Sequence, residues 1–463
     1  MTVDLSAVNS LIDAGRYDEA EGLCERALAE DPAAAEFHAA YGNSLFARKQ
    51  YDQAEHAYRQ ALSLRPEDPV VMTNLAGLLY EQGRYAECLR VCAKILSVKT
   101  DDASVYIHKG NALSASGRFD EALTSYDSAA RLTPDEPLIY YNKATVYLKK
   151  EDYDAAAALL EKLLKESSDN DEYLEAYAVA LEGNERFADA GRCRLTLLKH
   201  RPDDANRISL GGVIYSMRAR GMEDEATALS DDWLAAFPDD PFAKHTVKVL
   251  SGGEGEKRAS AAYVGALFDV FADSFDEVLE KLDYRAPDLI ADAVVETGKD
   301  VGAFLDLGCG TGLCGKALQE RHVSLRSATG VDLSEKMLEK ADGRGFYTQL
   351  VCADILSYLP QHQKTFDTVV SGDVFTYLGD LSATVTGLSF VLKDGGRAVF
   401  SFTDNEQTAD DFYLTPSGRY VHKKDYVDRL LRQAGFASET FKPAVLRQEM
   451  GLPVNGFIVI ARR

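Results

Sequence analysis

A period of 34 residues runs through the first half of the chain and constrains its fold more than any other feature. Units begin near residues 1, 35, 69, 103, 137, 171 and 205, and the seventh matches after an insertion of two residues. The twentieth position of the unit holds a small residue throughout: Ala20, Ala54, Cys88, Ala122, Ala156, Ala190 and, after the insertion, Ala226. A fixed period of this length is typical of a stacked array whose units bury their apolar faces against one another.

Two further positions of the unit indicate a pair of helices. Gly15, Gly83 and Gly117 come just before an Arg and an aromatic residue, where a second helix is expected to open. A proline precedes the next unit at Pro32, Pro66, Pro134 and Pro202. These positions resemble the tetratricopeptide repeat, which implies an α-helical solenoid over residues 1–250 with a concave groove. Pro241–Leu250 is expected to form its capping helix.

The same resemblance implies which side chains line the groove. These are first-helix positions and read Asn43, Phe46, Thr73, Tyr80, Ile107, Asn111, Tyr141, Thr145 and Leu148. The column in which relatives that hold a terminal carboxylate carry Lys reads Ala39, Thr73, Ile107, Tyr141 and Glu175, so a carboxylate clamp is not expected. A groove of aromatic and amide side chains favours a protein or peptide partner bound as an extended segment or a helix. The alternative is that the array serves only homo-oligomer assembly or braces the rest of the chain.

Ser251–Glu256 reads Ser-Gly-Gly-Glu-Gly-Glu, which predicts a linker over residues 251–260 and a second domain over residues 261–463. Strand-like and helical segments alternate from there, as in a doubly wound α/β sheet. The expected strands are Ala303–Leu307, Ser327–Asp332, Tyr347–Cys352, Thr365–Ser371, Arg397–Phe402, Thr440–Pro443 and Gly456–Arg462.

Phe304–Gly312 reads Phe-Leu-Asp-Leu-Gly-Cys-Gly-Thr-Gly, an apolar strand that ends in a glycine-rich turn before a helix. Such a turn lets a ligand approach bare backbone amides. The spacing is G-x-G-x-G, with Asp306 two residues before the first glycine, whereas a dinucleotide fingerprint reads G-x-G-x-x-G. A pyrophosphate is unfavourable beside a carboxylate, but a ligand that carries an ammonium group and a sulfonium is not. A second strand then ends in Asp332, an acceptor suited to ribose hydroxyls.

These residues resemble motif I of class I S-adenosylmethionine-dependent methyltransferases, which implies a seven-stranded Rossmann-like sheet whose last strand is antiparallel. In that family the backbone of a loop such as Gly308, Cys309, Gly310 and Gly312 approaches the methionine part of S-adenosyl-L-methionine. The resemblance implies that Asp306 orients this loop and reaches the amino group, and that Asp332 binds the ribose with Leu333 against the adenine. It also places Asp354, before Ile355, near the adenine amino group, and Asp373 near the methionine end or the acceptor.

A narrower likeness, to a bacterial group of methyltransferases with tetratricopeptide repeats, covers almost the full length. The group is related to trans-aconitate and ubiquinone-type methyltransferases. The segment from Tyr263 to Asp276 resembles its lid helix, so Tyr263 and Phe271 are expected to close over the cofactor. Gly418–His422 and Leu446–Gly456 fit the group as well.

A general base is needed only for an acceptor that keeps its proton at neutral pH. The candidates are His422, Asp373, Tyr377 and Tyr420; His422 has a suitable ordinary pKa, although a solvated surface role is equally compatible with its Lys-rich surroundings. Tyr420 is also a candidate for contact with the substrate. Arg447 is a candidate for binding a substrate carboxylate, with pairing to Glu449 as the alternative.

Charge and cysteine content exclude several classes of function. The formal charge of −23 divides into −15 for residues 1–250 and −8 for residues 251–463, so neither half is basic and a nucleic-acid substrate is not expected. The seven cysteines are scattered without C-x-x-C spacing, which favours reduced thiols and no metal site. With no apolar run approaching 18 residues and no leader, a cytoplasmic enzyme without membrane contact is expected.

The sequence therefore predicts a methyltransferase whose solenoid docks a protein or carrier-bound substrate. Two alternatives stay open. One is a small-molecule O- or carboxyl-methyltransferase in which the repeats serve assembly, and the other is a scaffold that binds the cofactor without turnover.

Overall fold

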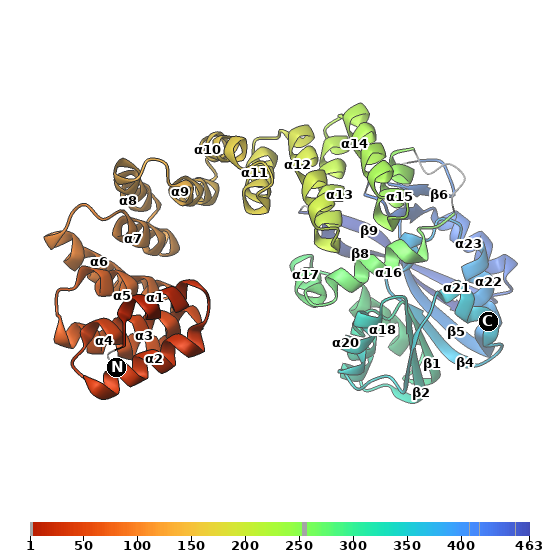
Figure 1. Cartoon of the computed structure of the whole chain (residues 1–463). Helices are drawn as coiled ribbons and strands as arrows, with labels where there is room; N and C mark the ends of the chain where they lie inside the picture. The colour runs from red at the N-terminus through yellow and green to blue at the C-terminus, as the bar shows by residue number, and fades with distance from the viewer. Residues whose placement is uncertain (1–2, 252–256, 407, 416, 450) are drawn as a thin grey trace. The chain divides into compact units, whose positions relative to one another are not determined.

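The computed structural model describes residues 3–251, 257–406, 408–415, 417–449 and 451–463. Contacts divide the chain into two compact units, Met1–Cys193 and Arg194–Arg463 (Figure 1). Most of the linker expected over residues 251–260, namely 252–256, lies outside the described residues.

The first unit is built from helices that follow the 34-residue period. They are α1 Leu5–Asp13, α2 Tyr17–Glu30, α3 Ala35–Ala47, α4 Tyr51–Leu64, α5 Pro69–Glu81, α6 Tyr85–Val98, α7 Ala103–Ala115, α8 Phe119–Leu132, α9 Pro137–Lys149, α10 Tyr153–Glu166, α11 Asp171–Gly183 and the start of α12 Phe187–His200. The small residue of every unit, from Ala20 to Ala226, is 0% exposed. This confirms that a small side chain lies where two helices cross closely.

The turn between the helices of each pair places one residue in the left-handed region. That residue is Gly15 (φ 72°), Gly83 (φ 72°) or Gly117 (φ 74°) in three units, and Lys49 (φ 60°), Glu151 (φ 60°) or Glu185 (φ 58°) in three others. Glycine adopts this conformation without steric cost, whereas a side chain with a Cβ atom is strained there.

The second unit begins with three further helices, α13 Asp204–Ala219, α14 Glu223–Ala236 and α15 Pro241–Leu250. Helix α13 has 16 residues, whereas α3, α5, α7, α9 and α11 have 13 each. Helix α15 is the expected capping helix; Asp240 accepts hydrogen bonds from the amides of Phe242 and Ala243, and Pro241 occupies its first turn. Helix α15 packs on the next helix of the chain, where the His245 ring stacks on the Tyr263 ring with centroids 3.8 Å apart.

The rest of the second unit is an α/β domain. Its helices are α16 Ala261–Phe271, α17 Phe275–Lys281, α18 Ala286–Thr297, α19 Leu313–Glu320, α20 Glu335–Asp342, α21 Ile355–Tyr358, α22 Ser382–Val391 and α23 Lys424–Gln433, with short 3-10 helices η1 Leu359–Gln361 and η2 Phe375–Tyr377. Its strands are β1 Asp300–Leu307, β2 Ser324–Asp332, β3 Gln349–Cys352, β4 Phe366–Ser371, β5 Leu392–Thr403, β6 Phe412–Leu414, β7 Tyr420–His422, β8 Ser438–Glu449 and β9 Leu452–Arg462.

Seven strands form one sheet in the order β3-β2-β1-β4-β5-β9-β8. The five strands β1 to β5 are parallel to one another, and β9 runs antiparallel to both β5 and β8. All seven predicted strands are present, so the predicted sheet is confirmed. The hairpin of β6 and β7 was not expected; it lies between β5 and α23 and includes pairs such as Tyr413 with Val421.

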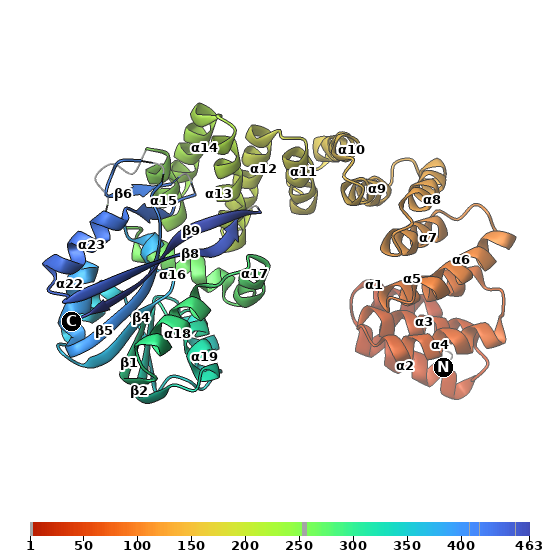
Figure 2. The same cartoon turned by 180° about the vertical axis from the view of Figure 1, so that it is seen from behind.

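Helices cover both faces of the sheet (Figure 2). Strand β1 is buried along almost its whole length and alternates between two cores: Phe304 packs with α18 and α19, whereas Leu305 packs with α21, α22 and α23. Among the described residues, no helix combines the length and the apolar character needed to span a bilayer.

Candidate active site

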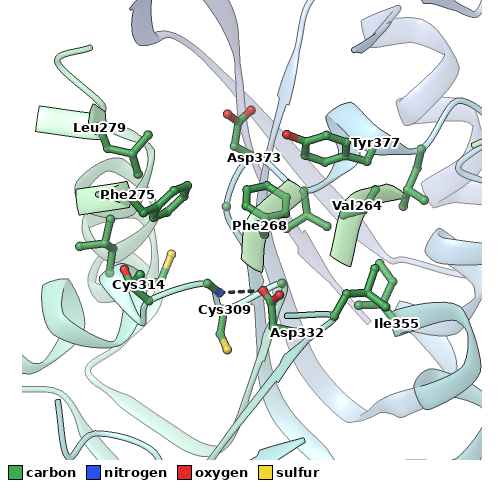
Figure 3. Close-up of a pocket in the computed structure, with 18 of the residues that line it drawn as sticks. Val264, Phe268, Phe275, Leu279, Cys309, Cys314, Asp332, Ile355, Asp373 and Tyr377 are labelled. Atoms are coloured by element: carbon green, nitrogen blue, oxygen red, sulfur yellow. Dashed lines mark hydrogen bonds between the residues drawn. The ribbon is translucent and has the colours of Figure 1, made fainter. Parts of the chain in front are cut away.

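A cleft opens where the parallel strands end. Asp332 is the last residue of β2, and Asp354 and Asp373 follow β3 and β4 by two residues. All three line one pocket of about 1210 Å³ of empty space, together with the loop after β1 (Figure 3). The carboxyl edge of a parallel sheet is where ligands bind in doubly wound folds. The structure thus gathers most of the predicted site residues: Gly308, Cys309, Gly310, Asp332, Leu333, Asp354, Ile355, Asp373, Tyr377 and Arg447.

The glycine loop needs its glycines for two different reasons. At Gly308 (φ 67°) a Cβ atom would lie 2.2 Å from Cγ2 of Val374, so only glycine fits under the next loop. At Gly310 the nearest atom to a Cβ would be on Phe275 at 3.8 Å, which leaves the backbone open to the cleft. The amide of Gly310 donates to Oδ2 of Asp332 at 2.9 Å, and this bond holds the loop against the end of β2. Gly312 (φ 86°) caps α19 and does not line the pocket.

Asp306 lies fully buried beneath this loop. The hydroxyl of Tyr347 donates to its Oδ2 at 2.6 Å, while Oδ1 has no hydrogen-bond partner among the described residues. Burial raises the pKa of the Asp306 carboxyl to about 7; the Tyr347 bond opposes this and the charge of Asp332 adds to it. Asp306 is 0% exposed and does not line the cleft itself; it lies beneath the loop with one oxygen unpaired among the described residues.

Asp332 and Asp354 lie on the floor of the cleft. Oδ1 of Asp332 accepts from the amide of Ser334 at 3.0 Å, and burial raises the pKa of this carboxyl. Asp354 caps α21 and also accepts from Nη1 of Arg258 at 2.6 Å. Asp354, the predicted acceptor for the adenine amino group, therefore also binds Arg258 in the segment that leads into α16.

Four charged side chains meet at the other end of the cleft. Arg447, 4% exposed, donates to Asp373 at 2.6 Å and to Glu449 at 2.8 Å, and Arg419 also pairs with Glu449. Burial opposes the charged form of Arg447, but Asp373 and Glu449 outweigh it and raise its pKa. Asp373 has a left-handed backbone (φ 59°), which is strained for a residue with a side chain and is common at functional sites.

The apolar wall of the cleft comes from residues of the expected lid segment and from the helix turn after it, to which no cofactor contact was assigned. Val264 and Phe268 project from α16, and Phe275 and Leu279 from α17. These elements are fixed to the site, because Asp269 accepts from Ser334 Oγ at 2.5 Å and Asp276 accepts from Thr311 Oγ1 at 2.6 Å. Helical spacing groups Val264 with Phe268, but it groups Leu267 with Phe271 equally well, so the sequence alone does not tell which pair faces the cleft.

The prediction that Tyr263 and Phe271 close over the cofactor is wrong. Both lie on the opposite face of α16 and line a different cavity, where Tyr263 packs on Phe242 and His245 of α15. Residues 263–276 lie beside the cleft, as expected of the lid segment, but the side of α16 that faces the cleft carries Val264 and Phe268 rather than Tyr263 and Phe271.

The structure also contradicts the roles predicted for His422 and Tyr420. His422 is 0% exposed and outside the cleft, with Nε2 at 2.8 Å from the carbonyl oxygen of Leu378 and 3.0 Å from that of Gly379. Burial lowers its pKa to about 4, so a neutral ring donates to these carbonyls and it is not a base for the cleft. Tyr420, 2% exposed, packs with Val249 and Leu414. Period-two alternation in β7 hides both side chains.

The residues of the cleft fit S-adenosylmethionine. The unpaired oxygen of Asp306 is an acceptor of the kind its ammonium end needs, and the backbone at Gly310 is open to the cleft. Asp332 keeps acceptor capacity beyond its two backbone bonds. Leu333, Ile355 and Leu378 offer apolar surface for a flat ring at the other side.

Comparison with known proteins agrees with this geometry. Residues 305–400 match the sequence model of the methyltransferase domain, and residues 5–69, 45–108, 107–172 and 141–205 match models of the tetratricopeptide repeat.

Curated relatives match the methyltransferase half. The biotin biosynthesis bifunctional protein BioHC of Saccharophagus degradans is 32% identical over 199 residues, 39% of this chain and 34% of the relative. The ubiquinone biosynthesis O-methyltransferase of Idiomarina loihiensis is 34% identical over 103 residues, 21% and 40% of the two chains. The malonyl-[acyl-carrier protein] O-methyltransferase of Brevibacillus brevis is 32% identical over 107 residues, 22% and 38%. The chain thus spans at most two fifths of the length of these relatives.

Among solved structures, a methyltransferase from Mesorhizobium loti is 23% identical with a TM-score of 0.29, over 37% of this chain and 96% of that one. The Pseudomonas aeruginosa protein pilF is 20% identical with a TM-score of 0.40, over 44% and 92%.

The chain carries N-terminal tetratricopeptide repeats followed by a methyltransferase domain with a seven-stranded α/β sheet. Within that domain it is distantly homologous to the ubiquinone O-methyltransferases and to other methyltransferases dependent on S-adenosylmethionine.

Proposed function

We propose that this protein transfers a methyl group from S-adenosylmethionine to an acceptor in the cleft. The observation that carries the proposal is the convergence of the Gly308–Gly310 loop, Asp332 and Asp373 on one pocket within the domain matched to methyltransferases. The cofactor supplies an electrophilic methyl carbon, and the electron pair of the breaking sulfur–carbon bond stays on sulfur while an acceptor lone pair forms the new bond.

The chain's own residues bind, align and exclude water. Asp332 accepts from the ribose hydroxyls, and the glycine loop with Asp306 beneath it receives the ammonium end. Phe268 and Phe275 cover the cleft from α16 and α17. Because charge disperses during methyl transfer, alignment and a dry site contribute more than charge stabilisation does.

We propose further that the solenoid docks a protein or carrier-bound acceptor. Asn43 of the second unit accepts from Tyr58 (2.8 Å) and from Asn74 of the third unit (2.8 Å). The same arrangement recurs 68 residues later, where Asn111 accepts from Tyr126 (2.6 Å) and Asn142 (3.1 Å). These bonds fix the amides in a hollow that Phe46 and Tyr80 also line. A row of oriented amides beside aromatic rings suits the backbone of an extended peptide.

A small-molecule acceptor is the second candidate. It is favoured by a second, largely apolar cavity beside the cleft, which Leu282, Tyr377 and Arg419 border from both sides. A largely apolar cavity of this kind suits a small molecule, and the solenoid then serves assembly, including homo-oligomers.

The test is to incubate the full-length protein and tritiated S-adenosylmethionine with lysate from a host strain that lacks this protein. Label is counted in precipitated protein and in the small-molecule filtrate, with Asp332→Ala protein as the control. Label in a discrete protein band supports docking by the solenoid, and label confined to the filtrate supports the second candidate. If neither fraction exceeds the Asp332→Ala control, the proposed activity is wrong, and calorimetry with S-adenosylmethionine then decides whether the protein binds the cofactor without turnover.

A further inference from the structure

A second cavity of about 1510 Å³ of empty space lies within the Arg194–Arg463 unit, between α13, α15 and α16. Its apolar walls come from three helices and one tryptophan: Ile208, Ile214 and Tyr215 of α13, Phe242, Val249 and Leu250 of α15, Tyr263, Leu267 and Phe271 of α16, and Trp233 of α14. Helices of the repeat fold and of the methyltransferase domain therefore build it together.

The cavity borders the cleft. Leu282, Tyr377 and Arg419 line both spaces, and the Tyr377 ring packs edge-on against Phe268 of the cleft wall with centroids 5.4 Å apart. Glu449 lines the cavity, whereas Arg447, its partner at 2.8 Å, lines the cleft. A molecule in the cavity therefore lies next to the end of the cleft at which Asp373 is placed.

Two consecutive glycines widen the cavity. Gly211 and Gly212 lie in the middle of α13, where glycine destabilises a helix relative to alanine. A glycine in a helix is usually explained by close packing, yet nothing lies within 4 Å of a Cβ atom built at either position. Both line the cavity, so the missing side chains leave space for a ligand rather than for another helix.

One cation in the cavity wall has no carboxylate partner. Nη1 of Arg218 donates to the carbonyl oxygen of Val249 at 2.9 Å, and no ion pair of Arg218 occurs among the described residues. Arg207, by contrast, pairs with Asp204 and Asp240, both at 2.8 Å. Because a carbonyl oxygen is uncharged and occupies one N–H group here, Arg218 keeps its positive charge and most of its guanidinium donors available. The planar guanidinium group can bind both oxygens of a carboxylate.

We propose that this cavity binds the methyl acceptor, and that the acceptor is a small organic acid with an apolar body. Its carboxylate pairs with Arg218, its body lies against the open face of Gly211 and Gly212, and its other end reaches Tyr377 and Arg419 beside the cleft. This inference rests on the proposed methyltransferase function and develops its second candidate, the small-molecule acceptor, for which it names the substrate class.

The test measures ligand binding by the full-length protein without requiring turnover. The fluorescent probe 1-anilinonaphthalene-8-sulfonate, an aromatic anion, is titrated and then displaced with decanoate, decanol or decyltrimethylammonium. Cofactor affinity is measured in parallel by calorimetry. We expect decanoate to displace the probe at a concentration at least tenfold lower than the other two.

Two variants locate the binding. Gly211→Leu fills the open face and should abolish displaceable probe binding, whereas Gly22→Leu, a helix glycine with equally open space in α2, should not. Arg218→Gln should remove the preference for decanoate over decanol, and Arg326→Gln on the exposed side of β2 should keep it. The Arg218 comparison decides the matter if Gly211→Leu proves unfolded by circular dichroism.

Equal displacement by acid, alcohol and ammonium, or an unchanged preference in Arg218→Gln, overturns the inference and leaves the proposed function standing if the cofactor still binds. If decanoate binds but the protein shows no cofactor affinity, both the inference and the proposed function are wrong, because the cavity then holds an acid that is not a methyl acceptor.

Discussion

The hydroxyl of Tyr347 lies 2.6 Å from Oδ2 of Asp306 and makes the single side-chain hydrogen bond to that carboxyl among the described residues. The folded pKa of Asp306 is raised to about 7, so the group is largely protonated in acid and charged above pH 7. Because its charged form is needed to receive the ammonium of the cofactor, cofactor affinity should fall roughly tenfold per pH unit below about pH 7.

Calorimetric titrations between pH 5.5 and 8.5 measure this dependence. The pKa of Asp332 is raised in the same direction, so the Tyr347→Phe variant serves to separate the two: without its hydrogen bond the Asp306 pKa rises further and the inflection moves to higher pH. For the protein without cofactor the sign is reversed, and the contribution of Asp306 to the free energy of unfolding declines as pH rises from about 4 to 7. An affinity that is flat across this range contradicts the assignment.

Replacing Asp332 by alanine should weaken cofactor binding by about 2–3 kcal/mol, because two ribose hydrogen bonds to a charged acceptor are lost. The variant also releases the amide of Gly310. Calorimetry at pH 8 measures the change, and Asp394→Ala, which removes an exposed carboxylate paired with Lys364, is the control. Equal affinities of the two variants mean that the ribose lies elsewhere.

His422→Ala should lower stability rather than remove a base. It leaves the carbonyls of Leu378 and Gly379 without their buried donor, at a cost of about 1–3 kcal/mol. Since the folded pKa of His422 is lowered to about 4, its contribution to stability is lost as pH falls from about 6.5 towards 4. Urea unfolding at pH 7.5 and 5 measures both effects, and a methylation rate at pH 7.5 that collapses while the fold stays intact restores the base hypothesis.

Glycine substitutions at the left-handed turns should stabilise the repeats. Lys49→Gly and Glu151→Gly remove a Cβ atom from a backbone with φ near 60° and should each add about 1 kcal/mol to the free energy of unfolding. Gly83→Ala at the equivalent turn should subtract a similar amount. The urea transition followed by far-ultraviolet circular dichroism is the measurement; destabilisation by Lys49→Gly shows that its side chain contributes more than the strain costs.

Two truncations should behave differently. Deleting residues 1–193 removes the first compact unit and should leave cofactor affinity unchanged while reducing methylation of a large acceptor. Deleting residues 1–250 also strips α15 from Tyr263 and should reduce solubility and thermal stability. Calorimetry and thermal unfolding compare the two, and full activity of the shorter deletion on a large acceptor removes the docking role.

The repeats and the sheet could be predicted from the sequence because both depend on residue patterns within short stretches of the chain. The buried small residue recurs at a fixed spacing, and the central strands β1 and β4 are short, mostly apolar and buried. The motif residues Gly308, Asp332 and Asp373 meet in space because consecutive parallel strands end at one edge.

The errors concern side chains whose direction depends on distant partners. Tyr263 and Phe268 belong to one apolar helix, and only the packing of α15 shows which of them faces the cleft. His422 reads as exposed beside two lysines, but the carbonyls that bury it come from residues 43 and 44 positions away. The second cavity had no motif, because it is lined by side chains from several separate helices, α13, α14, α15 and α16.

The two faces of α16 have a thermodynamic consequence. One face, through Val264 and Phe268, forms a wall of the cleft, and the other, through Leu267 and Phe271, forms a wall of the cavity. A ligand that shifts this helix alters both spaces at once. Occupancy of either space then changes affinity in the other, and reciprocity requires the factor to be the same in both directions.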